Sequence, residues 1–138
     1  MNRKNDFKMK YFISGHRDVT VKEFNEFYKP MINKVINNDK EATFVVGDYH
    51  GVDIMAQNYL VECGMEEKTT VFHMNEQPMN YNHAIKNKVG GFKTDEERDS
   101  AMTDFSDFDI AFVRCNKWKD SGTAINLRRR FTMKYLAD

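Results

Sequence analysis

The sequence lacks the residues and runs that mark several classes of protein. It contains only two cysteines, Cys63 and Cys115, and they form no CxxC pair. No apolar run approaches the roughly 20 residues of a membrane-spanning helix, and the polar start "MNRKNDFKMK" is unlike the apolar part of a secretory signal. We therefore expect a cytoplasmic protein with reduced thiols and no membrane partner, with residues 1–9 as a flexible extension.

An excess of charge of either sign is also missing. Lys and Arg together number 21, as do Asp and Glu, so the formal net charge is zero. Because phosphate contacts normally need a basic surface, we do not expect nucleic acid as a partner. The basic stretch "NLRRRFTMKYL" is typical of a solvated helix face. With 41% hydrophobic residues, the 138-residue chain can bury one core, so we expect one domain over residues 1–138.

Metal and nucleotide fingerprints are absent as well. The four histidines show no HExxH spacing, and the chain contains neither GxGxxG nor GxxxxGK[ST]. We therefore expect no metal and no cofactor. His16 and His50 follow two different apolar runs, which fits either hydrogen bonding in a pocket or ordinary loop histidines.

Four short apolar runs are present, at residues 11–14, 43–46, 69–73 and 109–114. None alternates apolar with polar residues, which predicts strands buried on both faces. Helical patterns lie between them, at residues 24–36, 52–63, 94–102 and from about 122. The alternation predicts an α/β fold: a Rossmann-like, doubly wound, mostly parallel sheet of four to five strands with helices on both faces.

Details of the helical patterns refine this prediction. Thr20 and Glu23 form a capping box at the start of the first helix, and Pro30 should kink or split that helix. Gly64 is placed to end the second helix. The irregular segment 74–93 is either a flap near the site or an ordinary long loop.

The candidate binding residues lie where the strands end. Ligands of such sheets bind beyond the carboxyl ends of the strands, and helix N-termini there attract anions. Arg17 fits a phosphate clamp or a surface ion pair, and Asp53 fits a dipole-stabilised carboxylate or a functional one. The predicted ligand-binding residues are Ser14, Gly15, His16, Arg17, Gly47, Asp48, Gly51, Asp53, Ser121, Gly122 and Thr123.

Four motifs in order along the chain, "YFISGHRD", "VVGDYHGVDIMA", "ERDSAMTDFSDFDIAFVR" and "SGTAINL", resemble the SLOG superfamily. This group of Rossmann-like proteins includes the Lonely Guy phosphoribohydrolases and the DNA-processing protein A family. It is related to nucleoside 2-deoxyribosyltransferases and deoxynucleotide N-hydrolases. The resemblance, over about residues 11–130, implies a nucleotide-binding domain that forms dimers or larger homo-oligomers.

Individual positions carry over from this resemblance. The glycine-rich second motif would hold phosphate or nucleotide, Arg98 stands at the functional arginine of the Lonely Guy enzymes, and Gly122 with Thr123 ends their glycine motif. Two positions depart from the pattern: Asp99 replaces a lysine and Asn126 replaces a glutamate. An asparagine cannot act as a carboxylate base.

Three functions remain open from the sequence. The first is an enzyme, a hydrolase or a deoxyribosyltransferase-like protein, that acts on an N-glycosidic bond of a nucleoside or nucleotide. Its catalytic carboxylate would be Asp53, Glu97 or Asp48, with Arg17 and Arg98 on the phosphate. The second, favoured by Asn126, is a non-catalytic binder or sensor of a nucleotide-derived ligand. The third is binding of single-stranded DNA, supported only by "LRRR".

Overall fold

The computed structural model describes residues 8–113 and 121–137, with side chains described up to residue 130. In these residues the chain forms one sheet of five strands in the spatial order β4-β3-β2-β1-β5, and every pairing is parallel. The strands are β1 (Lys10–Ser14), β2 (Thr43–Val46), β3 (Thr69–Met74), β4 (Asn87–Phe92) and β5 (Phe108–Ala111). The predicted α/β, Rossmann-like doubly wound fold is therefore confirmed. Most of the predicted N-terminal extension, residues 1–7, lies outside the described residues.

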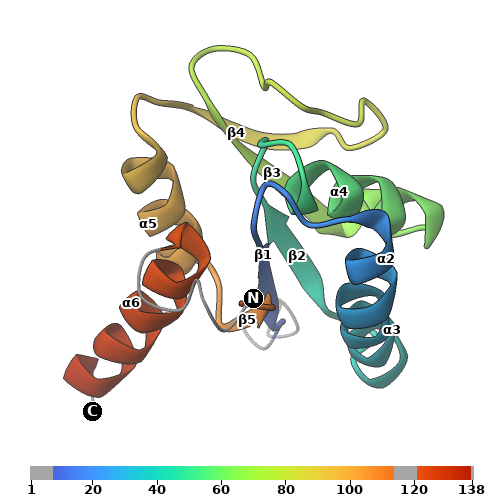
Figure 1. The fold of residues 1–138 in the computed structure, drawn as a ribbon, viewed down its shortest axis with the longest axis horizontal. Helices are drawn as coiled ribbons and strands as arrows, with labels where there is room; N and C mark the ends of the chain where they lie inside the picture. The colour runs from blue at the N-terminus through green and yellow to red at the C-terminus, as the bar shows by residue number, and fades with distance from the viewer. Residues whose placement is uncertain (1–7, 114–120, 138) are drawn as a thin grey trace, which may run out of the picture.

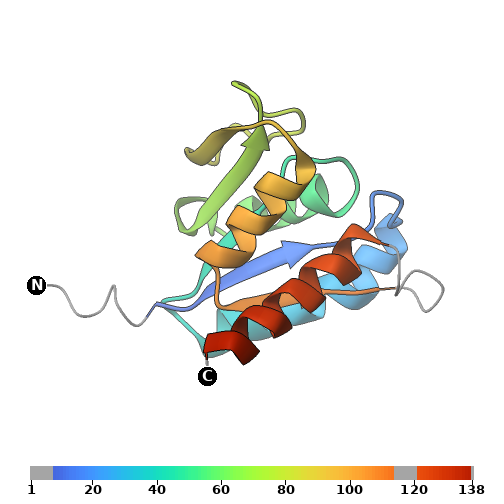
Figure 2. The same cartoon turned by 90° about the vertical axis from the view of Figure 1, so that its left-hand side faces the viewer.

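Helices cover both faces of the sheet (Figures 1 and 2). One face carries α2 (Val21–Glu23), the π-helical turn η1 (Phe24–Tyr28), α3 (Lys29–Asn38) and α4 (Val52–Glu62). The other carries α5 (Asp95–Phe105) and α6 (Gly122–Ala137), and a short 3-10 turn, η2 (Glu66–Lys68), precedes β3. Because neighbouring strand residues point to opposite faces, Ile13 joins the core cluster under α4 whereas Phe12 joins the one that contains Met102 of α5.

The helix signals in the sequence correspond to observed contacts. The Thr20 hydroxyl accepts from the Glu23 amide at 3.1 Å, and the Glu23 carboxylate accepts from the Thr20 amide at 3.0 Å, which confirms the capping box. Pro30 lies in the first turn of α3, directly after the π-helical turn, so the predicted split is also confirmed. Gly64 ends α4 with φ +77°, as expected.

The prediction that residues 74–93 form an irregular segment was wrong for the last part of that segment. Residues 87–92 form β4, an edge strand of the described sheet, paired with β3. Five of its six residues are exposed and two are glycines, so only Val89 and Phe92 give the stretch any apolar character. A strand that buries little surface leaves little trace in the hydrophobic pattern.

The strand order places the ligand-binding end of the sheet. The chain adds β2, β3 and β4 successively to one side of β1, and then returns through α5 to place β5 on the other side. The order therefore reverses between β1 and β5. In open α/β sheets, the crevice beyond the carboxyl ends at such a switch point is where ligands bind. We therefore expect the ligand site to be formed by the segments after β1 and β2 and by the first turns of α5 and α6.

Candidate functional site

A cavity of about 580 Å³ lies at this switch point. That volume is in the range of small-molecule sites. Phe12 and Met102, from the core cluster on the α5 face, form part of its apolar lining. The cavity is therefore built on the sheet face covered by α5 and α6, at the carboxyl end of β1.

Nine predicted residues line this cavity. Ser14 is the last residue of β1, and Gly15, His16 and Arg17 follow it. Asp53 comes from the first turn of α4, Arg98 from α5, and Ser121, Gly122 and Thr123 from the start of α6. The second histidine singled out in the sequence, His50, lines the cavity as well.

Two predicted catalytic carboxylates, Glu97 and Asp48, do not line it. Glu97 is exposed, and its carboxylate accepts from the Lys93 amide at 3.2 Å in front of α5. A residue one position before Arg98 is rotated by about 100° from it around the helix. Asp48 is fully buried beneath the cavity, so we retain neither as a group that touches a ligand.

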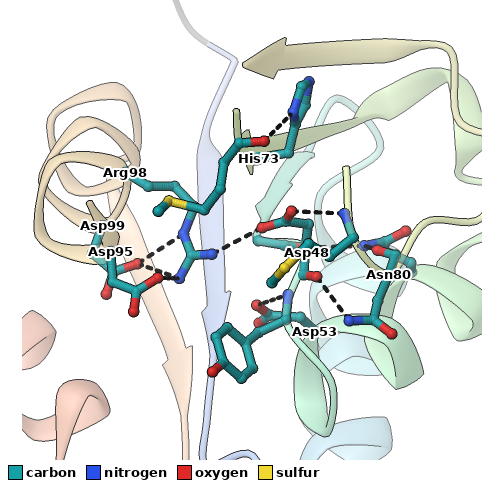
Figure 3. A network of polar contacts seen from close by, with 12 residues as sticks. Asp48, Asp53, His73, Asn80, Asp95, Arg98 and Asp99 are labelled. Atoms are coloured by element: carbon teal, nitrogen blue, oxygen red, sulfur yellow. Dashed lines mark hydrogen bonds and ion pairs between the residues drawn. The ribbon is translucent and has the colours of Figure 1, made fainter. Parts of the chain in front are cut away.

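Asp48 instead holds the other parts of the site in place (Figure 3). Its Oδ1 accepts from Arg98 Nη1 at 2.9 Å, and its Oδ2 accepts from the Met79 amide at 3.0 Å. Its backbone oxygen accepts from both the amide and the side chain of Asn80. Asp48 therefore joins β2, α5 and the loop 75–86, and it is a positioning residue.

The guanidinium of Arg98 is surrounded by carboxylates (Figure 3). Besides Asp48, it contacts Asp99, with Nε and Nη2 at 3.3 and 3.2 Å from Oδ1, and Asp95 at 3.6 Å. Arg98 is only 5% exposed. These contacts are ion pairs within the protein. Because three carboxylates already bind Arg98, they compete with the predicted role of this residue as a phosphate ligand.

Asp53 presents a carboxyl group to the cavity. Its Oδ2 accepts from the Tyr49 amide at 3.0 Å, and its Oδ1 has no hydrogen bond to the described residues. Burial raises the pKa of Asp53 to about 7, although the Tyr49 hydrogen bond and Arg98 act in the opposite direction. A carboxyl group that exchanges its proton near neutral pH is suited to acid–base chemistry.

Two glycines make this placement possible. A Cβ on Gly47 would lie 2.5 Å from Asp53 Oδ2, so any other residue there would displace the carboxylate from its position at the end of β2. Gly51 precedes α4 with φ +82°, and a Cβ there would collide with the backbone carbonyl of Arg17. The glycines in "VVGDYHGVDIMA" therefore serve close packing around Asp53, and neither lines the cavity.

The sequence reading did not single out Asp95 and Asp99 as site residues. Both line the cavity with Arg98 and Met102, because positions 95, 98, 99 and 102 share one face of α5. Their spacing from Arg98, three residues before it and one after it on the predicted helix, is the signal by which the sequence could have identified them. Burial raises the pKa of Asp99, opposed by Arg98 and by a hydrogen bond from Asn126.

The part of the cavity near Arg17 and the start of α6 is more favourable to an anion than the part near the aspartates. The Arg17 guanidinium lies 4.6 Å from the centre of the Tyr49 ring, and both residues line the cavity. The Ser121 hydroxyl caps α6 by accepting from the Ala124 amide at 3.0 Å, so the positive end of that helix faces the same space.

Ser14 provides a polar group without a partner. The residue lines the cavity and is 5% exposed, and its buried hydroxyl makes no hydrogen bond to the residues that the structure describes. Its backbone is fixed: the Ser14 carbonyl accepts from the Tyr28 hydroxyl at 2.8 Å, and that hydroxyl accepts from the Phe112 amide at 3.0 Å. Tyr28 thereby joins the ends of β1 and β5 beneath the cavity.

The segment 75–86 is tied to the sheet. The Gln57 side chain, fully buried in α4, donates to the carbonyls of Gly47 and Asn80 and accepts from the Asn82 amide. No residue of this segment lines the cavity. Of the two readings left open for the segment, the contacts fit a packed loop that supports Asp48.

The basic residues of α6 are partly engaged within the protein. Arg130 forms two hydrogen bonds to the Asp109 carboxylate and further ones to Ser106. Arg129 donates to Asn126 Oδ1 at 2.7 Å. Two of the three consecutive arginines therefore secure α6 and its neighbours, which weakens the argument for a surface that binds DNA.

In the part of the chain that the structure describes, no cluster of His, Cys, Asp or Glu is arranged to hold a metal ion. No helix among the same residues is long and apolar enough to cross a membrane. Comparison with protein-family models, curated proteins and solved structures finds no match to this chain.

Proposed function

We propose that the protein binds a nucleoside or nucleotide in the cavity and cleaves its N-glycosidic bond. The observation that carries the proposal is the Asp53 carboxyl group. It lines a cavity of small-molecule size at the switch point of the sheet, keeps one oxygen free of partners among the described residues, and has a pKa of about 7. These are the properties of a general base that works near neutral pH.

The chemistry requires a water held between Asp53 and the anomeric carbon of the sugar. Asp53 takes a proton from this water, the oxygen bonds to the anomeric carbon, and the bond to the base nitrogen breaks. The base leaves with that electron pair and takes up a proton from solvent. A second nucleobase in place of water would give base exchange, which is the deoxyribosyltransferase variant of the same reaction.

The acidic surroundings of Asp53 are suited to a transition state that carries positive charge. Cleavage of such bonds proceeds through an oxocarbenium-like state, which carboxylates stabilise. Asp95 and Asp99 line the same cavity and add to the negative potential there. Arg17 and the first turn of α6 provide the region where a sugar phosphate would sit.

The test is incubation of the purified protein with a panel of nucleosides and their 5′-monophosphates, followed by mass spectrometry. We expect free base and the matching sugar or sugar phosphate. The rate should rise with pH through about 7, because the base form of Asp53 is the active one. Asp53→Asn should lower the rate by roughly 10²–10⁴-fold, the range typical of a general base.

Asp104→Asn is the matched control, because Asp104 is exposed, lies on α5 and is not part of the cavity lining. The same substitution there should leave the rate unchanged. A panel that yields no product, or an Asp53→Asn variant that keeps the full rate, would overturn the proposal of catalysis.

A second candidate function is binding of the same ligand without turnover. Asn126 favours it, because this residue replaces a glutamate of the SLOG-like pattern, is buried in the cavity wall and is hydrogen-bonded to Asp99 and Arg129. Recovery of an intact nucleotide-derived ligand, unchanged after long incubation with the protein, would favour this function.

Two further expectations belong to the proposal. We propose a cytoplasmic location and, from the SLOG resemblance, a homodimer or larger homo-oligomer. Light scattering coupled to size-exclusion chromatography tests the second, with a mass of 16.3 kDa as the result that contradicts it.

A further inference from the structure

Among the described residues that line the cavity, acidic side chains outnumber arginines. Its described lining includes four aspartates and two arginines, together with His16 and His50. The carboxylates belong to Asp18, Asp53, Asp95 and Asp99, and the guanidinium groups to Arg17 and Arg98. Behind the lining, the fully buried Asp48 adds another carboxylate. Arg98 is shared among Asp48, Asp95 and Asp99, so one guanidinium group faces three carboxylates and this cluster is acidic as a whole.

This imbalance disfavours an ordinary nucleotide, which is an anion with a neutral base. Like charges repel more strongly in a partly desolvated cavity than in water, so charge complementarity decides which ligand enters. The region near Arg17 and α6 can accept one anionic group. The region formed by Asp53, Asp95 and Asp99 calls for a group that carries positive charge.

The unpartnered Ser14 hydroxyl independently points to a ligand in this space. A buried hydroxyl without a hydrogen bond is uncommon in folded proteins, because its desolvation is not compensated. Ser14 follows Phe12 on the same face of β1 and lines the cavity with it. A ligand that fills the cavity would satisfy the hydroxyl, which can donate to a sugar or phosphate oxygen.

We propose that the cavity selects a nucleoside or nucleotide whose base carries a positive charge on the ring attached to the sugar. The cationic base lies against the carboxylates of Asp53, Asp95 and Asp99, and any phosphate lies toward Arg17 and the first turn of α6. This inference rests on the proposed N-glycosidic site and names its substrate class.

A cationic base also simplifies the reaction. The base leaves as a neutral molecule when the bond to its ring nitrogen breaks, because the bonding electrons cancel its positive charge. It therefore needs no proton, and the proton that Asp53 removes from water is released to solvent. The described lining offers carboxylates to stabilise the oxocarbenium-like state, and this reaction requires no acid dedicated to the leaving base.

The experiment uses two probes of nearly the same shape: nicotinamide mononucleotide, whose pyridinium ring is a cation, and its reduced form, whose ring is neutral. Isothermal titration calorimetry at pH 8 should show the oxidised form binding at least about tenfold more tightly, since one charge interaction of 1.4 kcal/mol gives that factor. The preference should decrease as salt is added.

Variants identify the residues that carry the preference. Asp95→Asn should reduce the ratio of the two affinities, whereas Asp104→Asn on the exposed side of the same helix should leave it unchanged. Ser14→Ala should weaken both probes by a similar factor, because the hydroxyl contacts the part they share. Unchanged binding in Ser14→Ala would refute the role given to Ser14.

The outcomes separate this inference from the proposed function. Preferential binding of the oxidised probe without any cleavage supports the inference and contradicts catalysis. Equal binding of the two probes, with cleavage of neutral nucleosides, refutes the inference and leaves the proposed function intact. If neither probe nor any neutral nucleotide binds, both are wrong.

Discussion

Substitution of Asp53 by asparagine should stabilise the protein in a pH-dependent way. Asparagine has nearly the shape of a protonated aspartic acid, and its side-chain oxygen can still accept from the Tyr49 amide. It differs in that it never ionises. The folded wild-type protein must either keep a proton on the partly buried Asp53 or bear an unfavourable charge there.

The magnitude follows from the two pKa values of Asp53. The pKa is raised from 3.8 to about 7 on folding. Between these values the folded state holds a proton that the unfolded state has lost, so wild-type stability decreases as pH rises, by about 4 kcal/mol in total. From pH 5 to pH 8 the decrease amounts to about 3 kcal/mol. Asp53→Asn removes this decrease.

Urea denaturation of both proteins at pH 5 and pH 8 measures the effect. The difference in the free energy of unfolding between Asp53→Asn and wild type should grow by about 3 kcal/mol between these pH values. Asp104→Asn should change stability by less than about 0.5 kcal/mol at either pH, as exposed substitutions do. A difference that is the same at both pH values, or that falls toward pH 8, would refute the reasoning about Asp53.

Three other substitutions test the framework of the site. Arg98→Met leaves the buried Asp48 without its ion pair and should destabilise the fold by about 3–5 kcal/mol. Adding Asp48→Asn to the same chain should recover part of the lost stability. Losses that simply add in urea denaturation would contradict the pairing. Tyr28→Phe removes the hydroxyl that joins the ends of β1 and β5 and should lower stability by about 1–3 kcal/mol; an unchanged midpoint would contradict its role. Gly47→Ala places a methyl group against Asp53 and should lower stability by about 1–3 kcal/mol; a stability equal to that of wild type would show that the carboxylate moves freely.

The sequence predicted the buried parts of the fold well. The run at residues 43–46 coincides with β2, and the helical pattern at 52–63 differs from α4 by one residue. These segments bury one or both faces, so their apolar spacing carries the information. The exposed edge strand β4 buries little, and the sequence pattern missed it.

The candidate site was predicted in part. The ends of β1 and β2 and the start of α6 were expected to converge because parallel strands place their carboxyl ends at one edge. Asp53 and Arg98 were singled out, and both line the cavity. Glu97 was preferred over Asp99, although only the latter lies on the face of α5 that meets the cavity.

The sequence by itself determined the α/β class, the order of most elements and the set of strand ends at which a ligand would bind, because these depend on local periodicity and on turn chemistry. Only the tertiary structure decided what each carboxylate does. Asp48 and Asp53 both follow β2 in the sequence, yet Asp48 is buried under Arg98 while Asp53 faces the cavity. Burial and ion-pair partners come from segments about 50 residues apart, and no local pattern encodes them.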